Sequence, residues 1–145
     1  MRAVVQRVTS ASVEVEGELV GSIGPGLCVL VGVSRDDTTE EADRLADKLW
    51  TLRVFEDDEG KMNRSASELG RELLIVSQFT LFADTSRGRR PSFLGAAAPD
   101  EAEPLVEELI AGLARRGARV ASGRFRADMA VTLTNDGPVT IILEV

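Results

Sequence analysis

A short apolar run that ends in hydrogen-bonding side chains is the stretch of this chain best suited to chemistry. Leu73 to Val76 is continuously apolar, and Ser77, Gln78 and Thr80 follow it closely. A run this short fits a strand buried on both faces better than a helix. Because an unpaired buried polar group costs free energy, these side chains must either hydrogen-bond within the fold or face a pocket.

The residue inventory limits the chemistry that such a pocket could perform. Histidine is absent and cysteine occurs once, at Cys28. The Ser-His and Cys-His nucleophile pairs are thereby excluded, as is nearly every zinc site built from His or Cys. Catalysis would have to use hydroxyls, amides, carboxylates, backbone groups or the substrate itself. Cys28 lies in an apolar run and is interpreted as a small buried hydrophobe, which suits an intracellular protein without disulfides.

A basic loop follows the polar strand end. Residues 81–98 form a long loop by the usual statistics, and Arg87, Arg89 and Arg90 lie there in a stretch without acids. The net charge of -7 argues against a general nucleic-acid coat, and we expect no DNA partner. A local basic patch can still hold a phosphate backbone, because charge is screened within about 10 Å. Taken alone, the arginines are most simply interpreted as a solvated surface. If the loop lies beside a pocket, they would be suited to bind the end of an RNA.

Period-two alternation of apolar residues predicts most of the strands. The predicted strands cover residues 4–8, 11–15, 19–23, 27–33, 52–55, 73–76, 120–124, 129–134 and 139–144. Residues 135–138, Asn-Asp-Gly-Pro, are predicted to join the last two strands as a hairpin, with Gly137-Pro138 as a rigid corner that presents carbonyl oxygens. A proline that merely starts an edge strand is the simpler alternative.

Two amphipathic helices are predicted to cover one face of the sheet. Thr38 and Glu41 have capping-box spacing, and an apolar stripe at helical spacing follows them. A second helix follows Pro99 and ends at Gly117, with its regular part expected to begin at Pro104. The whole chain, residues 1–145, is expected to form one α/β domain of mixed β-sheets with two main helices. No run of about 18 apolar residues exists, so we expect no membrane span.

Four blocks of residues, taken in order, point to a known family. They are Ser77-Gln78-Phe79-Thr80-Leu81, Gly88-Arg89-Arg90-Pro91-Ser92-Phe93, Ala127-Asp128-Met129 and Asn135-Asp136-Gly137-Pro138-Val139-Thr140. Together they resemble the signature of D-aminoacyl-tRNA deacylases. Val5-Gln6-Arg7-Val8 and the segment 21–32 are similar too, so the resemblance covers essentially the whole chain. Arg126 departs from the family's pattern, which has glycine at this place.

The resemblance implies a fold of β/β/α layers and a homodimeric, cytoplasmic enzyme without metal or cofactor. Its partner would be the 3′ end of an aminoacyl-tRNA, and its reaction the hydrolysis of the ester between a D-amino acid and the terminal adenosine. Glycyl-tRNA, which has no chirality at the α-carbon, would be expected to react as well. The resemblance also implies a cis Gly137-Pro138 bond, and that this corner enters the pocket of the other subunit.

Roles for the strand-end residues follow from the chemistry of an ester that is already reactive. The amides around Phe79 and Thr80 are expected to bind the oxyanion, while Ser77 and Gln78 hold the turn or touch the adenosine. Thr80 could instead act as a covalent nucleophile, although no activating base is identified in the sequence. The 2′-hydroxyl of the substrate ribose is the preferred assisting group.

Substrate selection is expected to rest on other residues. Gly137 and Pro138 would bind the ammonium group through their carbonyls and exclude an L side chain, while Phe125 and Met129 would contact the substrate. Arg87, Arg89 and Arg90 remain candidates for the RNA backbone. Two alternatives stay open: a non-catalytic module that binds RNA 3′ ends, and a related deacylase for a small L-amino acid with a trans Gly137-Pro138 bond.

Overall fold

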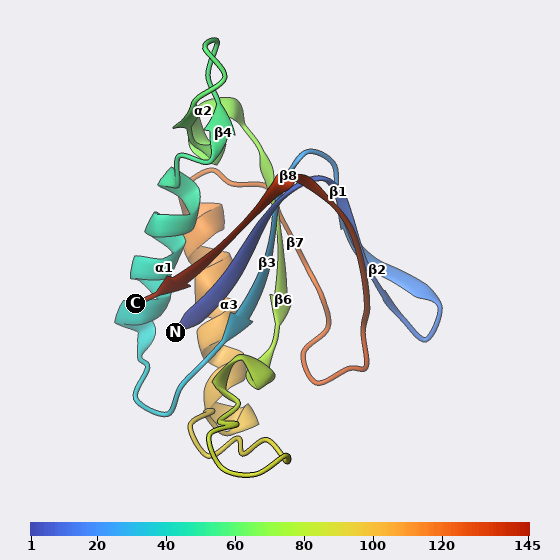
Figure 1. Ribbon diagram of the computed structural model, residues 1–145, viewed down its shortest axis with the longest axis vertical. Helices are drawn as coiled ribbons and strands as arrows, with labels where there is room; N and C mark the ends of the chain where they lie inside the picture. Colours follow the sequence, from blue (N-terminus) through green and yellow to red (C-terminus); the bar gives the residue numbers. More distant parts are fainter.

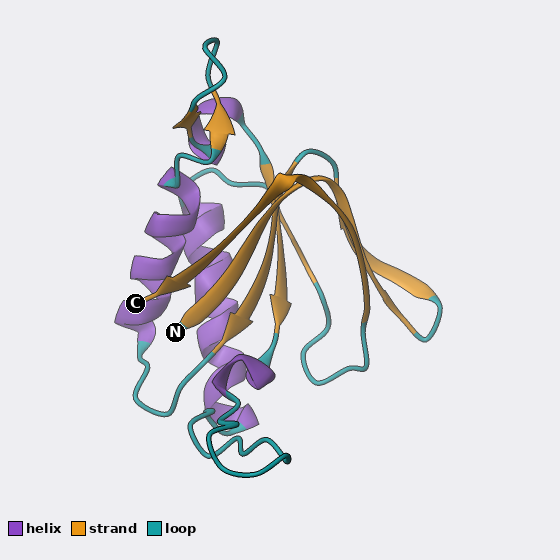
Figure 2. Cartoon of the chain, viewed as in Figure 1, coloured by secondary structure: helices purple, strands orange, loops and turns teal.

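A curved six-stranded sheet with two long helices on one face forms the body of the molecule (Figure 1, Figure 2). The computed structural model describes all residues from 1 to 145. The helices are α1 (Thr39–Thr51), α2 (Ala66–Leu69), the 3-10 helix η1 (Phe79–Phe82) and α3 (Pro99–Arg115). The strands are β1 (Arg2–Val15), β2 (Glu18–Ile23), β3 (Gly26–Gly32), β4 (Phe55–Glu56), β5 (Met62–Arg64), β6 (Glu72–Ser77), β7 (Val120–Ser122) and β8 (Ala130–Glu144). The predicted α/β fold class is confirmed.

The order of the strands brings three carboxyl ends to one edge of the sheet. The main path is β2-β1-β3-β6-β7, and β8 pairs with β1 outside this path. β3, β6 and β7 are mutually parallel, whereas β1 is antiparallel to β2, β3 and β8. Parallel neighbours need crossover connections, and these contain α1 and α3. Both helices pack on the same face of the sheet (Figure 1).

Apolar side chains fill both faces of the central strands. A cluster of 23 buried residues lies with the two helices, and a second cluster of 7 lies on the other face. Leu73 and Ile75 belong to the first cluster, and Leu74 and Val76 to the second. All four are at most 2% exposed. The strand predicted to be buried on both faces is thus confirmed, with Ser77 as its last residue.

The first strand is longer than predicted. Residues 4–8 and 11–15 were expected to be separate strands, but β1 is continuous from Arg2 to Val15. Its register against β8 shifts between Gln6 and Val8 and again between Val8 and Ser10. These irregularities change the phase of the apolar alternation while the backbone stays extended, which is why the pattern resembled two strands.

The predicted C-terminal hairpin is wrong, because β8 is one strand. Leu133 pairs with Ala11 and Ile142 pairs with Val4, so both halves of β8 continue along the same partner, β1. The register moves from Asn135 opposite Val8 to Thr140 opposite Gln6, which leaves residues 136–139 as a bulge. A hairpin and a bulged strand share the same alternation, so the sequence pattern could not separate them.

The helix ends follow the sequence signals closely, with one exception. Thr38 and Glu41 form the expected capping box. The Gly117 amide donates to Ala114 and the Ala118 amide to Leu113, which ends α3 at the predicted place. However, α3 begins at Pro99, not at Pro104, which lies inside the helix and is exposed. An interior proline removes one backbone hydrogen bond, and the packing of α3 tolerates that loss.

One predicted strand is shorter than expected. The prediction covered Leu52 to Phe55, but β4 contains only Phe55 and Glu56.

Candidate active site

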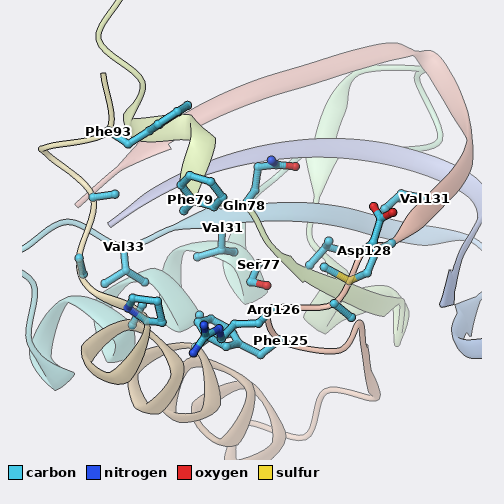
Figure 3. A pocket seen from close by; sticks show the side chains of 18 residues that line it. Val31, Val33, Ser77, Gln78, Phe79, Phe93, Phe125, Arg126, Asp128 and Val131 are labelled. Carbon is cyan, nitrogen blue, oxygen red and sulfur yellow. The ribbon is translucent and has the colours of Figure 1, made fainter. Parts of the chain in front are cut away.

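A cleft of about 570 Å³ opens where β3 and β6 end (Figure 3). Val31 and Val33 form one part of its wall, and Ala102 and Val106 from α3 form another. Crevices at the carboxyl ends of parallel strands are the usual ligand sites of α/β sheets. The topology therefore places a mostly apolar cleft directly beside the polar end of β6.

Three of the four predicted catalytic residues line this cleft. Ser77, Gln78 and Phe79 are on its wall, and Thr80 lies just outside it, where its hydroxyl accepts a hydrogen bond from the Gln78 amide side chain. The Gln78 main-chain amide donates to Val31 at 2.7 Å, which fixes the turn that follows β6. The Phe79 ring is 58% exposed and meets Phe93 edge to face, with 5.0 Å between centroids.

The turn after β6 leaves two neighbouring amides without acceptors. Phe79 and Thr80 are the first residues of η1, in which Leu81 donates to Gln78 and Ala83 donates to Thr80. Gln78 caps η1 without a side-chain hydrogen bond, and neither the Phe79 nor the Thr80 amide donates within the protein. Such first amides of a helix need partners from elsewhere. They are therefore available to a developing negative charge in or beside the cleft.

Two features not predicted as functional hold η1 in place. Gly32, at the end of β3, leaves room for it, because a Cβ there would lie 3.0 Å from the Phe82 ring and 3.1 Å from the Gln78 oxygen. Arg2 donates to the Leu81 oxygen at 2.7 Å, and its guanidinium lies 4.9 Å from the centre of the Phe82 ring. In the sequence, the close approach of η1 to β3 is signalled only by the glycine at the end of that strand, Gly32.

The opposite wall comes from the segment between β7 and β8. Phe125 and Met129, both predicted to contact substrate, line the cleft together with Arg126 and Asp128. Phe125 also packs against the main core, and Met129 packs against the second one. Arg126 and Phe125 lie side by side below Ser77 (Figure 3). The fold thus brings together two segments separated by more than forty positions in the sequence.

The three arginines of the loop 81–98 do not line the cleft, although Phe93 of the same loop does. Arg87, Arg89 and Arg90 are exposed, and none forms an ion pair with a carboxylate. The base of the loop is closed by Asp84 and Ser92, whose backbones exchange hydrogen bonds of 2.7 and 2.9 Å. Hydrogen bonds from Ser86 lower the pKa of the Asp84 carboxyl, which stays ionised at neutral pH. Because Arg87, Arg89 and Arg90 form no ion pair, their guanidinium groups are available to an anionic partner.

Gly137 and Pro138 lie away from the cleft of their own chain. They are joined by a cis peptide bond in the bulge of β8, opposite Arg7. Arg7 faces Leu27 at the start of β3, whereas the cleft lies at the end of β3. Asn135 closes the bulge by donating to the oxygens of Arg7 and Val139, each at 2.9 Å. No role was predicted from the sequence for Arg7 or Asn135. An arginine inside an apolar strand, such as Arg7, is the sequence signal that could have indicated one.

No group of three His, Cys, Asp or Glu side chains is arranged to hold a metal ion, and no helix is long and apolar enough to cross a membrane. The fold and the cleft define a small α/β protein without histidine that offers two main-chain amides beside an apolar cleft.

The chain belongs to the family described as D-Tyr-tRNA(Tyr) deacylase, whose pattern matches residues 4–144. A D-aminoacyl-tRNA deacylase of Streptomyces coelicolor is 57% identical over 146 residues and covers 100% of both chains. One of Heliobacterium modesticaldum is 55% identical, covering 99% of this chain and 96% of its own. The protein is accordingly an enzyme, a hydrolase of the deacylase family, as the resemblance indicated.

Two solved structures share the fold. A protein described as c-Myc DNA Unwinding Element Binding Protein is 44% identical, with a TM-score of 0.93 and coverage of 100% of this chain and 99% of its own. A probable eukaryotic D-amino acid tRNA deacylase is 20% identical, with a TM-score of 0.84 and coverage of 99% and 98%. The second likeness concerns the fold alone.

Proposed function

We propose that this protein hydrolyses the ester bond of D-aminoacyl-tRNA and releases a free D-amino acid and tRNA. The observation that carries the proposal is the pair of unbonded amides, Phe79 and Thr80, beside an apolar cleft in a member of the deacylase family. Because the substrate is a tRNA, the enzyme would act in the cytoplasm. Its role there would be quality control of translation. No metal or cofactor takes part in the proposed reaction.

The reaction needs only a placed water and a stabilised oxyanion. Water attacks the ester carbonyl carbon, and the negative charge that develops on the carbonyl oxygen is bound by the Phe79 and Thr80 amides. The bond to the ribose oxygen then breaks, and that oxygen takes up a proton. The neighbouring ribose 2′-hydroxyl assists the proton transfer. Ser77 and Gln78 hold the turn, and the Thr80 hydroxyl, already bonded to Gln78, is not the nucleophile.

Selection between D and L substrates is assigned to the Gly137-Pro138 corner of a second copy of the chain. The corner does not line its own cleft, so it could contact substrate only in the cleft of another subunit. β8 pairs with one strand only, and its Ile142 is 67% exposed, which suits an outer strand that meets a partner. Main-chain carbonyls at the corner would bind the ammonium group and leave no space for an L side chain, while glycine would pass.

The remaining predicted contacts complete the substrate site. Phe125 and Met129 offer apolar surface to the terminal adenine, and aromatic faces accept bases without regard to sequence. Arg87, Arg89 and Arg90 would bind the phosphates of the single-stranded end. The homodimer and these contacts are proposed together with the deacylase function and are tested separately from it.

Hydrolysis of matched substrates tests the proposal. D-tyrosyl-tRNA, L-tyrosyl-tRNA and glycyl-tRNA are each incubated with enzyme, and ester loss is compared with the uncatalysed rate. Rapid loss of the D-tyrosyl and glycyl esters with a stable L-tyrosyl ester is expected. A module that only binds RNA 3′ ends would protect all three esters. A deacylase for a small L-amino acid would leave the D-tyrosyl ester intact and, in a fourth reaction, cleave L-alanyl-tRNA. Sedimentation of the free protein separately reports whether it is a dimer.

A further inference from the structure

We propose that Arg126 binds the phosphate that links the terminal nucleoside of the RNA to the rest of the strand. This inference rests on the proposed function, because it assumes that the terminal adenosine occupies the cleft. It adds a contact on the wall opposite the arginine loop, so that the single-stranded end is held from two sides. The residues involved belong to the turn between β7 and β8.

The backbone of this turn would favour glycine at position 126. Ala127 donates to the Arg124 oxygen at 3.2 Å, which closes a four-residue turn over 124–127. Arg126 has φ of 62° in it, while Phe125 does not have positive φ. A single positive φ at the third position is the geometry of a type II turn, where glycine is the favoured residue. An arginine that accepts left-handed backbone at a cleft wall is a sign that its side chain is used.

The Arg126 guanidinium also lacks a partner. Six of the fifteen arginines lie within ion-pair distance of a carboxylate: Arg116, for example, lies 2.9 Å from Asp43 and 3.6 Å from Asp47. Arg126 is exposed, lines the cleft and has no carboxylate within ion-pair distance, although Asp128 lines the same cleft. The cation is therefore available to an anion that approaches the cleft.

The neighbourhood favours the last phosphate of a strand over other anions. Phe125, next to Arg126, supplies an aromatic surface within the cleft, and Arg87, Arg89 and Arg90 lie in the loop beside it. A base against Phe125 would place its 5′-phosphate close to residue 126. Arg124 faces a smaller adjoining pocket that is lined by two carboxylates, Glu103 and Glu107, whereas the cleft that Arg126 lines has one, Asp128. Arg126 is consequently the stronger phosphate candidate of the two.

The test measures binding of uncharged tRNA by the intact protein over a range of salt concentrations. Arg126→Gln removes the charge, Arg126→Lys keeps it, and Arg119→Gln is a matched control, because Arg119 is exposed and unpaired at the other end of β7. Arg126→Gln is expected to weaken binding about tenfold and to reduce the slope of log K against log salt by about 0.7, the value for one single-strand phosphate. Arg126→Lys should keep the slope, and Arg119→Gln should behave as the wild type.

Two further measurements separate a phosphate contact from a structural role. With a tRNA that lacks its terminal nucleotide and that nucleotide's phosphate, wild type and Arg126→Gln should bind equally. Arg126→Gly should bind as weakly as Arg126→Gln, yet unfold at an equal or higher temperature, because glycine relaxes the turn. Wild-type affinity and slope in Arg126→Gln, or an equal loss in Arg119→Gln, would overturn the inference. Since uncharged tRNA is the ligand, binding through Arg126 without hydrolysis of D-aminoacyl-tRNA would refute only the proposed function.

Discussion

Arg7 donates from Nε to the main-chain oxygen of Asp136 at 3.2 Å, although Arg7 is only 6% exposed. The same nitrogen lies 3.3 Å from the Asp136 carboxylate, and Nη1 donates to the Val54 oxygen at 2.7 Å. One buried guanidinium therefore joins the bulge of β8 to the segment that follows α1. The corner at Gly137 and Pro138 is held from behind by this contact.

Replacement of Arg7 by methionine should destabilise the protein. The buried bond to the Val54 oxygen and the part-buried bond to the Asp136 oxygen would both be lost, so we expect the free energy of unfolding to fall by about 3 kcal/mol. Urea denaturation measures the change. Arg44→Met is the control, because Arg44 only makes an exposed 3.9 Å contact with Glu41 and should change stability by less than about 0.5 kcal/mol. Equal midpoints for Arg7→Met and wild type would show that the Arg7 contacts contribute nothing.

Gly137→Ala should abolish most activity. A Cβ there would lie 2.7 Å from Val139 Cγ2, 2.9 Å from the Val139 nitrogen and 3.2 Å from Arg7 Nη2, and the φ of 130° disfavours any L side chain. We expect at least a tenfold loss of kcat/KM on D-tyrosyl-tRNA, since the corner must move. Gly24→Ala is a suitable control because its Cβ would approach nothing closer than 3.8 Å. Full activity in Gly137→Ala would mean that the corner's shape does not matter to the reaction.

The proposed oxyanion hole can be tested by removing one amide. Gln78, with φ of -146° and ψ of 81°, lies outside the helical region that a following proline disfavours, so Phe79→Pro deletes the amide with little disturbance of the backbone. Phe79→Ala is the matched variant that loses the same ring and keeps the amide. We expect kcat of Phe79→Pro to be about 100-fold or more below that of Phe79→Ala. Circular dichroism checks that both are folded, and similar kcat values would remove this amide from the mechanism.

A related variant addresses the Thr80 hydroxyl. If the main-chain amide is the functional group, Thr80→Ala should keep kcat within about threefold of wild type, because it changes no backbone donor. Single-turnover hydrolysis of D-tyrosyl-tRNA measures the chemical step directly. Complete loss of that step in a folded Thr80→Ala protein would instead favour a covalent role for the hydroxyl.

Cys28 should be unreactive while the protein is folded. It is 1% exposed, and burial raises the pKa of its thiol to about 11. The thiolate is the reactive form, and at pH 8 it would be about a thousandth of the total. We expect iodoacetamide labelling at pH 8 to be at least 100-fold slower in buffer than in denaturing urea. Mass spectrometry measures the label, and rapid labelling of the native protein would contradict the burial of this side chain.

Much of the fold follows from local patterns that tertiary packing did not change. The capping box at Thr38, the stop at Gly117 and the buried strand before Ser77 all occur where the sequence signals them. Each of these features is decided by neighbours within a few positions along the chain. Pro104 is the exception, since packing of α3 kept it inside the helix.

The amino-acid sequence by itself determined the chemistry that is available: it contains no histidine, and a polar turn follows a strand buried on both sides. Its four ordered blocks also indicated the family. Only the tertiary structure decided that residues 136–139 are a bulge on a continuous strand, that Arg7 supports this bulge, and that Phe125 faces Ser77 across a cleft. The physical reason is that alternation records which side of a strand is buried and nothing about its partner. The pairing of β8 with β1 and the crossover through α3 depend on contacts between residues far apart in the sequence, so they are determined by the packing of the whole chain.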